Sequence, residues 1–149
     1  MEALQNYDIA GVVGAVNPEL AQPSWGLAFD VMLRAKGWQP GLEASGAVGH
    51  GDYRHPELSV YGPTPRACRF LDGLLLMVRV GSLRDAQVRF DERFAFHLYG
   101  IDFCRMAVAA GLRLGTWPIT VTHRSHGNYD SGAWRKGAAE YLGKWDDEQ

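Results

Sequence analysis

The sequence predicts an α/β domain in which short strands alternate with helices. Three observations carry this prediction: an uninterrupted apolar run at 74–78, an alternation of apolar and polar residues at 119–124, and helical spacing of apolar residues at 100–110 and 134–145. The chain has 149 residues, which is the length of one domain, and 46% of them are hydrophobic, which is enough to bury a core. We therefore expect a single domain over residues 1–149.

The N-terminal half is predicted to contain one strand and a long loop. Residues 9–16 are apolar and precede Asn17-Pro18, as in a strand that ends in a turn. Residues 24–36 carry apolar side chains without a clean period, so no element is predicted there. Residues 41–55 include four glycines and two histidines, and we expect a mobile loop.

The C-terminal half is predicted to supply the central strand and two helices. Residues 68–80 are the strongest strand candidate, because their apolar run implies burial on both faces. Residues 100–110 have apolar residues at helical spacing and precede Gly111, a helix stop. Residues 119–124 alternate like a half-buried strand, and a last helix follows Ser131, a candidate N-cap. We expect the two strands to share one sheet, with the first helix packed near their ends.

Charge and hydropathy exclude several classes of partner. The net charge is -2 and no basic run occurs, which argues against nucleic acid and anionic membranes. The longest apolar stretch is far shorter than the roughly 20 residues of a membrane span, and the first residues lack the pattern of a signal peptide, so we expect a cytoplasmic protein. Cys68 and Cys104 lie in apolar segments without metal-binding spacing, and we expect buried, reduced thiols.

Five short motifs follow one another along the chain. They are an Asp-Gly pair, a Phe-Asp-Glu-x-Phe turn, an acidic helix start, an Ala-Gly helix end and a strand closing in histidine, at 72–73, 90–94, 100–102, 110–111 and 119–123. The ordered set resembles the second half of family-2-like (GT-A) glycosyltransferases, over about residues 8–145. The resemblance implies a partial GT-A-like sheet flanked by helices, the half of the domain that binds the acceptor, without the N-terminal nucleotide-binding half.

The motif that binds the nucleotide in such enzymes does not occur in the sequence. In the resembled family an Asp-x-Asp motif holds a divalent metal and the diphosphate, whereas this sequence has no Asp-x-Asp, no Gly-x-Gly-x-x-Gly and no P-loop. We therefore expect no cofactor to be bound by this chain alone, with Mn or Mg belonging to a complete enzyme. A nucleotide sugar should bind only weakly. We also expect a homodimer or a complementing N-terminal domain to cover the surface left open.

Asp102 is the residue that the resemblance makes the candidate catalytic base. Inverting transfer needs a carboxylate that takes the proton of the acceptor hydroxyl. In similar sequences the earlier acid of the helix start has this role, but that position is Gly100 here, which leaves Asp102. The alternative is an exposed acid in the first helical turn, stabilised by the helix dipole and paired with Arg105.

Other residues are candidate substrate contacts. The resemblance makes Asp72 a contact of an acceptor hydroxyl, with Gly73 beside it, and the alternative is an acid that caps neighbouring backbone amides. Tyr99 and His97 are further candidates, although His97 can equally pack against neighbouring aromatic rings. Trp117 is the best candidate for an exposed ring on which a sugar stacks, since most of the five tryptophans are expected in the core.

His123 ends its strand, and by resemblance it would touch the metal or the diphosphate of a donor. It is therefore a metal ligand only if a metal arrives with the donor. His126 follows three residues later, but this pair alone is a weak zinc signal. The resemblance places Asp72, Asp102 and His123 on one cleft, while a small metal-dependent hydrolase using His97, Asp102, His123 and His126 is a distant alternative.

The function favoured by these observations is a glycosyltransferase-like domain that binds a saccharide acceptor and is incomplete on its own. The alternative is a non-catalytic carbohydrate- or protein-binding module derived from the same fold. Gly100 and the missing Asp-x-Asp favour the alternative.

Overall fold

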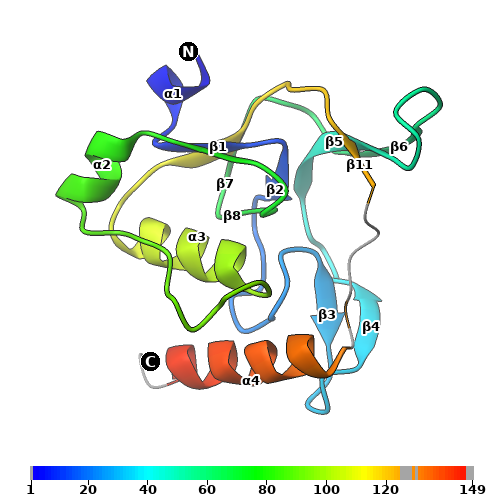
Figure 1. Cartoon of the computed structure of the whole chain (residues 1–149), viewed down its shortest axis with the longest axis vertical. Helices are drawn as coiled ribbons and strands as arrows, with labels where there is room; N and C mark the ends of the chain where they lie inside the picture. Colours follow the sequence, from blue (N-terminus) through cyan, green and yellow to red (C-terminus); the bar gives the residue numbers. More distant parts are fainter. Residues whose placement is uncertain (1, 125–128, 130, 147–149) are drawn as a thin grey trace.

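The computed structural model describes residues 2–124, 129 and 131–146, which form a mixed α/β structure (Figure 1). The helices are α1 (Ala3–Asn6), α2 (Val80–Asp85), α3 (Tyr99–Ala109) and α4 (Gly132–Asp146). The strands are β1 (Ile9–Gly11), β2 (Val13–Ala15), β3 (Leu27–Phe29), β4 (Ala35–Trp38), β5 (Ala44–His50), β6 (Glu57–Gly62), β7 (Arg66–Cys68), β8 (Phe70–Leu71), β9 (Leu76–Val78), β10 (Leu114–Thr116) and β11 (Thr122–His123). No helix within the described residues is long and apolar enough to cross a membrane.

The described strands form two larger sheets and one separate hairpin. The first sheet has the order β7-β10-β1-β9, in which β1 and β10 run parallel and the other neighbours antiparallel. The second sheet has the order β11-β5-β2-β8, with β6 paired antiparallel to β5 and β11 parallel to it. Strands β3 and β4 form the antiparallel hairpin.

The chain passes from the first sheet into the second at two places. Buried Val12 separates β1 from β2, and exposed Arg69 separates β7 from β8. The strand predicted at 9–16 is therefore two strands with a change of sheet between them. Because the strands continue into one another, the buried side chains of both sheets belong to one core cluster.

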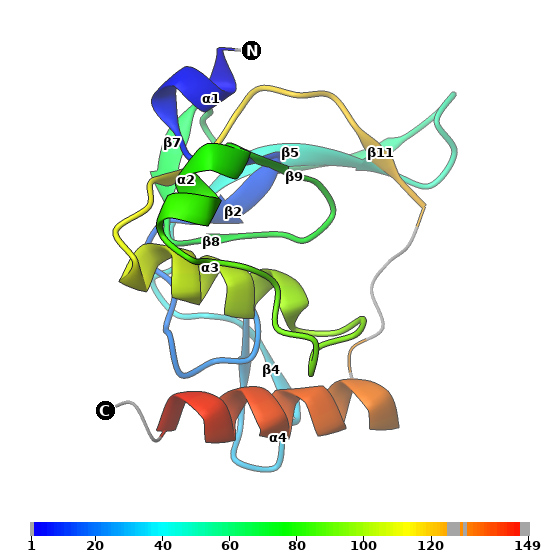
Figure 2. The same cartoon turned by 60° about the vertical axis from the view of Figure 1, so that its left-hand side comes forward.

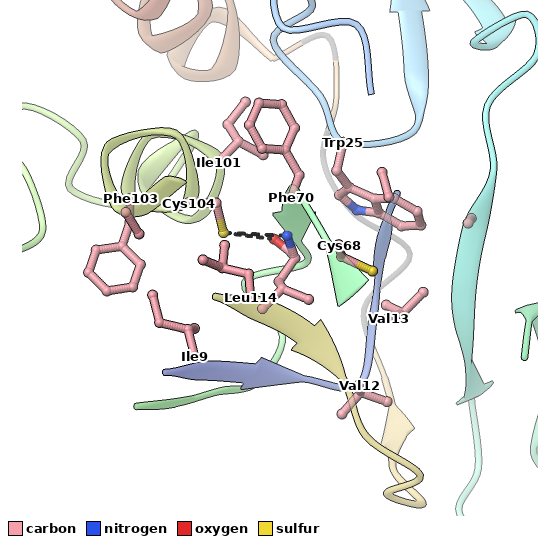
Figure 3. Close-up of a cluster of buried hydrophobic side chains, with 14 of the residues drawn as sticks. Ile9, Val12, Val13, Trp25, Cys68, Phe70, Ile101, Phe103, Cys104 and Leu114 are labelled. Atoms are coloured by element: carbon pink, nitrogen blue, oxygen red, sulfur yellow. Dashed lines mark hydrogen bonds between the residues drawn. The ribbon is translucent and has the colours of Figure 1, made fainter. Parts of the chain in front are cut away.

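Helix α3 covers this core with its buried face, as Figure 3 shows. Phe103 and Cys104 have no exposed surface, and the backbone N–H of Leu71 donates to Sγ of Cys104 at 3.3 Å. The helix predicted at 100–110 is thus confirmed. Cys68 and Cys104 are both buried and free, as expected, and burial raises the pKa of the Cys104 thiol to about 12.

Helix α4 runs beneath α3 and packs against the β3–β4 hairpin (Figures 1 and 2). Its predicted N-cap is confirmed, because Oγ of Ser131 accepts the N–H of Trp134 at 3.1 Å. The Trp134 ring lies 4.6 Å from the Phe29 ring between centroids, and buried Ala138 completes this second small core. Helix α4 therefore holds the hairpin in place.

The prediction of a single central strand at 68–80 is wrong. The segment contains the end of β7 and all of β8 and β9, and β9 lies at an edge of the first sheet. The chain turns after β8, where the Asp72 carboxylate accepts the N–H of Leu74 at 2.8 Å, and the apolar run at 74–78 is only half-buried. The prediction that this segment shares a sheet with β11 holds only for β8, because β7 and β9 belong to the first sheet, and α3 packs on β8 as predicted.

The prediction of a loop at 41–55 is also wrong, because this segment contains β5, the seven-residue strand of the second sheet. Its glycines allow neighbouring strands to approach closely: Gly46 has φ +110°, and a Cβ there would lie 2.2 Å from the carbonyl oxygen of Val12. The strand predicted at 119–124 is shorter than expected, since only Thr122–His123 pairs as β11. Half-buried and exposed side chains alternate over residues 119–124, as predicted.

Candidate functional site

The candidate site is built around the turn at Asp72. Its Oδ1 accepts the N–H of Leu74 at 2.8 Å, and its Oδ2 accepts the indole N–H of Trp25 at 2.6 Å. The carbonyl oxygen of Gly73 accepts the hydroxyl of Tyr99 at 2.8 Å, which ties the turn to the first residue of α3. Among the described residues each carboxylate oxygen has one donor, and a carboxylate oxygen can accept from a second partner.

The segment 24–39 positions two tryptophans beside this turn. Oγ of Ser24 accepts the N–H of Leu27 at 3.0 Å, which shapes the turn that carries Trp25. The buried side-chain amide of Gln39 donates to the carbonyl oxygen of Ser24 at 3.1 Å. This bond fixes the base of the β3–β4 hairpin, from which Trp38 projects.

Three aromatic rings meet at this place. The Trp25 ring stands edge-on to Trp38, with centroids 5.3 Å apart, and edge-on to Tyr61, with centroids 5.5 Å apart. The Trp38 and Tyr61 rings are stacked at 5.9 Å with 20° between their planes. Trp25 is buried, whereas Trp38 keeps 44% of its surface exposed and can still receive a ligand.

The second sheet contributes a row of polar side chains that leads to the Tyr61 ring. His123 of β11 pairs in register with His50 of β5, which pairs with Glu57 of β6. Because side chains alternate along a strand, Ser59 and Tyr61 follow Glu57 on the same face of β6. The row and the rings therefore face one space.

This space is a hollow of about 360 Å³. It has the size of a small-ligand site, and its walls combine aromatic rings with a few polar groups. The described residues that line it are Ser24, Trp25, Gly26, Leu27, Trp38, His50, Glu57, Ser59, Tyr61, Asp72, His123 and Tyr129.

His50 and His123 are the two described histidines of the hollow that could act as metal ligands. His50 and His123 are neighbours on adjacent strands and both line the hollow. Within the described residues, however, no group of three His, Cys, Asp or Glu side chains is arranged to hold a metal ion. His126 lies outside the described residues. No step through a metal is therefore assigned to this chain.

The structure does not place Asp102 at the hollow, so the expected convergence holds only for Asp72 and His123. The Asp102 side chain has no exposed surface; its carboxylate accepts the indole N–H of Trp145 at 2.9 Å and lies 2.8 Å from Nζ of Lys144. The alternative prediction, that Asp102 is an exposed first-turn acid paired with Arg105, is wrong as well. Arg105 instead lies over the Trp145 ring, 4.3 Å from its centroid. An enclosed carboxylate of this kind gives no support to a role as the base.

The remaining predicted contacts do not line the hollow. Tyr99 supports the Asp72 turn through Gly73, as described above, and the His97 ring packs edge-on against Phe96 at 4.9 Å. Trp117 is half-buried and lines a different hollow, of about 300 Å³, between β5 and the 117–122 segment. The structure therefore separates Trp117 from Asp72.

Gly100 brings the start of α3 against the Asp72 turn. A Cβ at this position would lie 3.2 Å from Cα of Gly73 and 3.3 Å from its nitrogen. A side chain at position 100 would thus point at the turn beside Asp72. This is the position where the resembled family has its acid.

The aromatic wall was not predicted from the sequence. Trp25 and Trp38 lie in a segment without periodicity, and Tyr61 lies in an edge strand that was not predicted at all. The sequence feature that could have revealed these rings was the unusual number of tryptophans for this length, but most of them were predicted to lie in the core. A hydrogen-bonded pair such as Trp25 and Asp72 joins residues distant in the chain, so no local pattern encodes it.

Chemically, the hollow can stack a flat apolar face on a ring and accept hydroxyl or amine protons at Asp72. A scan of known protein-family models gives no match to the chain, and no curated protein matches it.

Proposed function

We propose that the chain is a glycosyltransferase-like domain that binds a saccharide acceptor in the hollow beside Asp72. The observation that carries this proposal is the pairing of two stacked rings, the partly exposed Trp38 and the half-buried Tyr61, with a carboxylate that accepts the indole N–H of Trp25. A sugar ring has apolar C–H faces that stack on aromatic rings and hydroxyls that donate to carboxylates.

The resemblance to GT-A glycosyltransferases supports the same assignment. It implies an acceptor contact at Asp72 and a diphosphate-side group at His123, and both side chains line the hollow. The resembled base position, Gly100, packs on the turn that carries Asp72. The residues that the resemblance singles out therefore gather near one place, apart from Asp102.

A non-catalytic saccharide-binding module derived from the same fold is the second candidate. Two observations favour it: Gly100 offers no side chain to act as base, and the Asp102 carboxylate is enclosed by Lys144 and Trp145. Both candidates share the binding step and differ in turnover.

The binding step is tested with calorimetric titration of saccharides of varied stereochemistry against Trp38→Ala and Trp117→Ala. Trp38→Ala removes a partly exposed ring of the hollow and should weaken binding about 10-fold, because the stacking surface is lost. Trp117→Ala removes the same ring from the other hollow and should leave affinity unchanged. Equal affinities for wild type and Trp38→Ala would exclude this hollow as the saccharide site.

A further inference from the structure

The hollow described above carries two carboxylates, and its other described ionisable side chains are two histidines, His50 and His123, and two tyrosines. Asp72 lies at its inner wall and Glu57 at its rim, and no Lys or Arg is present in the described lining. Within the described residues neither carboxylate forms an ion pair with a Lys or Arg side chain. By contrast, the acids Asp30, Asp91 and Asp102 elsewhere in the chain are each paired with a cation.

The charge of Asp72 acts on the groups around it. Burial raises the pKa of Tyr99, and the negative charge of Asp72 raises it further. The same two causes, in the same order, raise the pKa of Tyr129 at the hollow. Asp72 is half-buried, and within the described residues its side chain accepts hydrogen bonds from the Trp25 indole and the Leu74 amide, which are both neutral groups. The described hydrogen bonds to this carboxylate therefore bring no positive charge to it.

The aromatic wall adds attraction of the same sign. The face of an aromatic ring carries partial negative charge and attracts a cation within about 6 Å of its centre. Trp38 is partly exposed beside Asp72, and Tyr61 stacks on it. Rings and carboxylates together form a lining that favours a positive group over a neutral or negative one.

We propose that the saccharide bound at this hollow carries a protonated amino group, so that the acceptor belongs to the class of amino sugars. The ammonium lies between the Asp72 carboxylate and the exposed ring of Trp38, with Glu57 adding attraction at the rim. This inference rests on the proposed function and specifies its substrate class.

The test compares sugars of one ring configuration whose substituents make them cationic, neutral or anionic. Methyl glycosides of glucosamine, N-acetylglucosamine, glucose and glucuronic acid, with the corresponding galacto series, are titrated into the full chain at low and high salt. The amino sugar of at least one series should bind roughly 5- to 10-fold more tightly than its neutral partner, and the preference should shrink at high salt. The uronic acid should bind most weakly.

Charge variants assign the preference to the hollow. Glu57→Gln removes a charge from an exposed side chain and should reduce the amino-sugar preference about 2- to 3-fold without changing the fold. Asp72→Asn should abolish the preference while retaining an oxygen acceptor. Glu2→Gln is the matched control, since it removes the same charge outside the hollow, and it should leave the preference intact.

The outcomes separate this inference from the proposed function. Equal or tighter binding of neutral or acidic sugars, or a preference that survives both Glu57→Gln and Asp72→Asn, would overturn the inference and leave the saccharide site standing. Failure of every sugar to bind would overturn the proposed function and this inference together.

Discussion

Asp102 shows how a single buried carboxylate can anchor two helices. It lies on α3, and both of its partners, Lys144 and Trp145, lie on α4. Lys144 also contacts Asp91 at 3.0 Å. The enclosed charge is thus compensated by an ion pair and an indole hydrogen bond, as a buried charge requires.

We expect Asp102→Ala to lower the free energy of unfolding by about 3–5 kcal/mol, because it leaves a lysine and an indole N–H without their buried acceptor. Urea unfolding monitored by tryptophan fluorescence measures the change. Asp102→Asn is the matched variant: it keeps an acceptor for the indole, and its loss of stability should be smaller. If Asp102→Asn instead abolished a transferase activity at unchanged stability, the residue would be a base after all.

Acid should destabilise the protein through carboxylates such as Asp8. Burial raises the pKa of Asp8, but the backbone N–H of Arg113 and the hydroxyl of Ser82 outweigh burial and hold the pKa below its usual value. A carboxylate with a lowered folded-state pKa stabilises the fold above the unfolded pKa of about 3.9, and this contribution is lost as the pH falls through the lower value.

Melting temperatures should therefore fall between about pH 5 and pH 2. Differential scanning calorimetry over this range checks the expectation. Asp8→Asn should flatten the acid branch of the curve. An unchanged slope in that variant would mean that other acids, such as Asp91, carry the whole effect, since the hydrogen bond from Arg93 and the charge of Lys144 also lower the pKa of Asp91.

At the scale of elements, β5 depends on close backbone approach at Gly46 as well as on the packing of its buried Val48. Gly46→Ala should cost at least about 3 kcal/mol, because the new Cβ would collide with the carbonyl oxygen of Val12 and φ is +110°. Gly51→Ala is the control: φ is +84° there, but no atom lies within 4 Å of the new Cβ. It should cost only the backbone strain of about 1–2 kcal/mol.

Chemical denaturation of both variants gives the two free energies. Similar losses of stability would contradict the close contact between β2 and β5. Because Gly46 sits where β5 begins to pair with β6, the larger loss should be accompanied by faster hydrogen exchange in β6.

Helices α3 and α4 were predicted from the sequence, whereas the short helices α1 and α2 were not, and the strands were predicted only in part. Helix α3 and the cap of α4 follow from local spacing and from Ser131, because a helix satisfies its hydrogen bonds within one segment. Strand β5 was missed because its partners lie elsewhere in the chain and its glycines resemble a loop. Asp72 and His123 were found from the ordered motifs, but the wall of Trp25 and Trp38 exists only after the hairpin folds over the turn.

At the scale of the whole molecule, the hollow beside Asp72 lacks, among the described residues, the groups that usually hold a diphosphate. The hollow is lined by Asp72 and Glu57 without a Lys or Arg, and no three-residue metal group is present in the described part of the chain. A diphosphate needs a metal clamp or a set of donors.

We therefore expect calorimetry with UDP-, GDP- and dTDP-sugars plus manganese to give dissociation constants no tighter than about 1 mM, and a nucleotide-release assay to give no turnover. Without a positioned base, rates would fall by a further factor of about 10²–10⁴. Micromolar binding with release of nucleotide would favour the transferase over the binding module.

The parallel pairing of β1 with β10 also governs when this protein can fold. Ile9 is paired with Leu114, so β1 completes its pairing only after a strand about 105 residues later has been made. Its antiparallel partner β9 is made earlier, and until β10 emerges one edge of β1 stays unpaired, which exposes an apolar strand to aggregation. Loop closure over this sequence separation also slows the folding transition. The nascent chain should consequently depend on chaperones that hold its N-terminal strand until β10 has emerged.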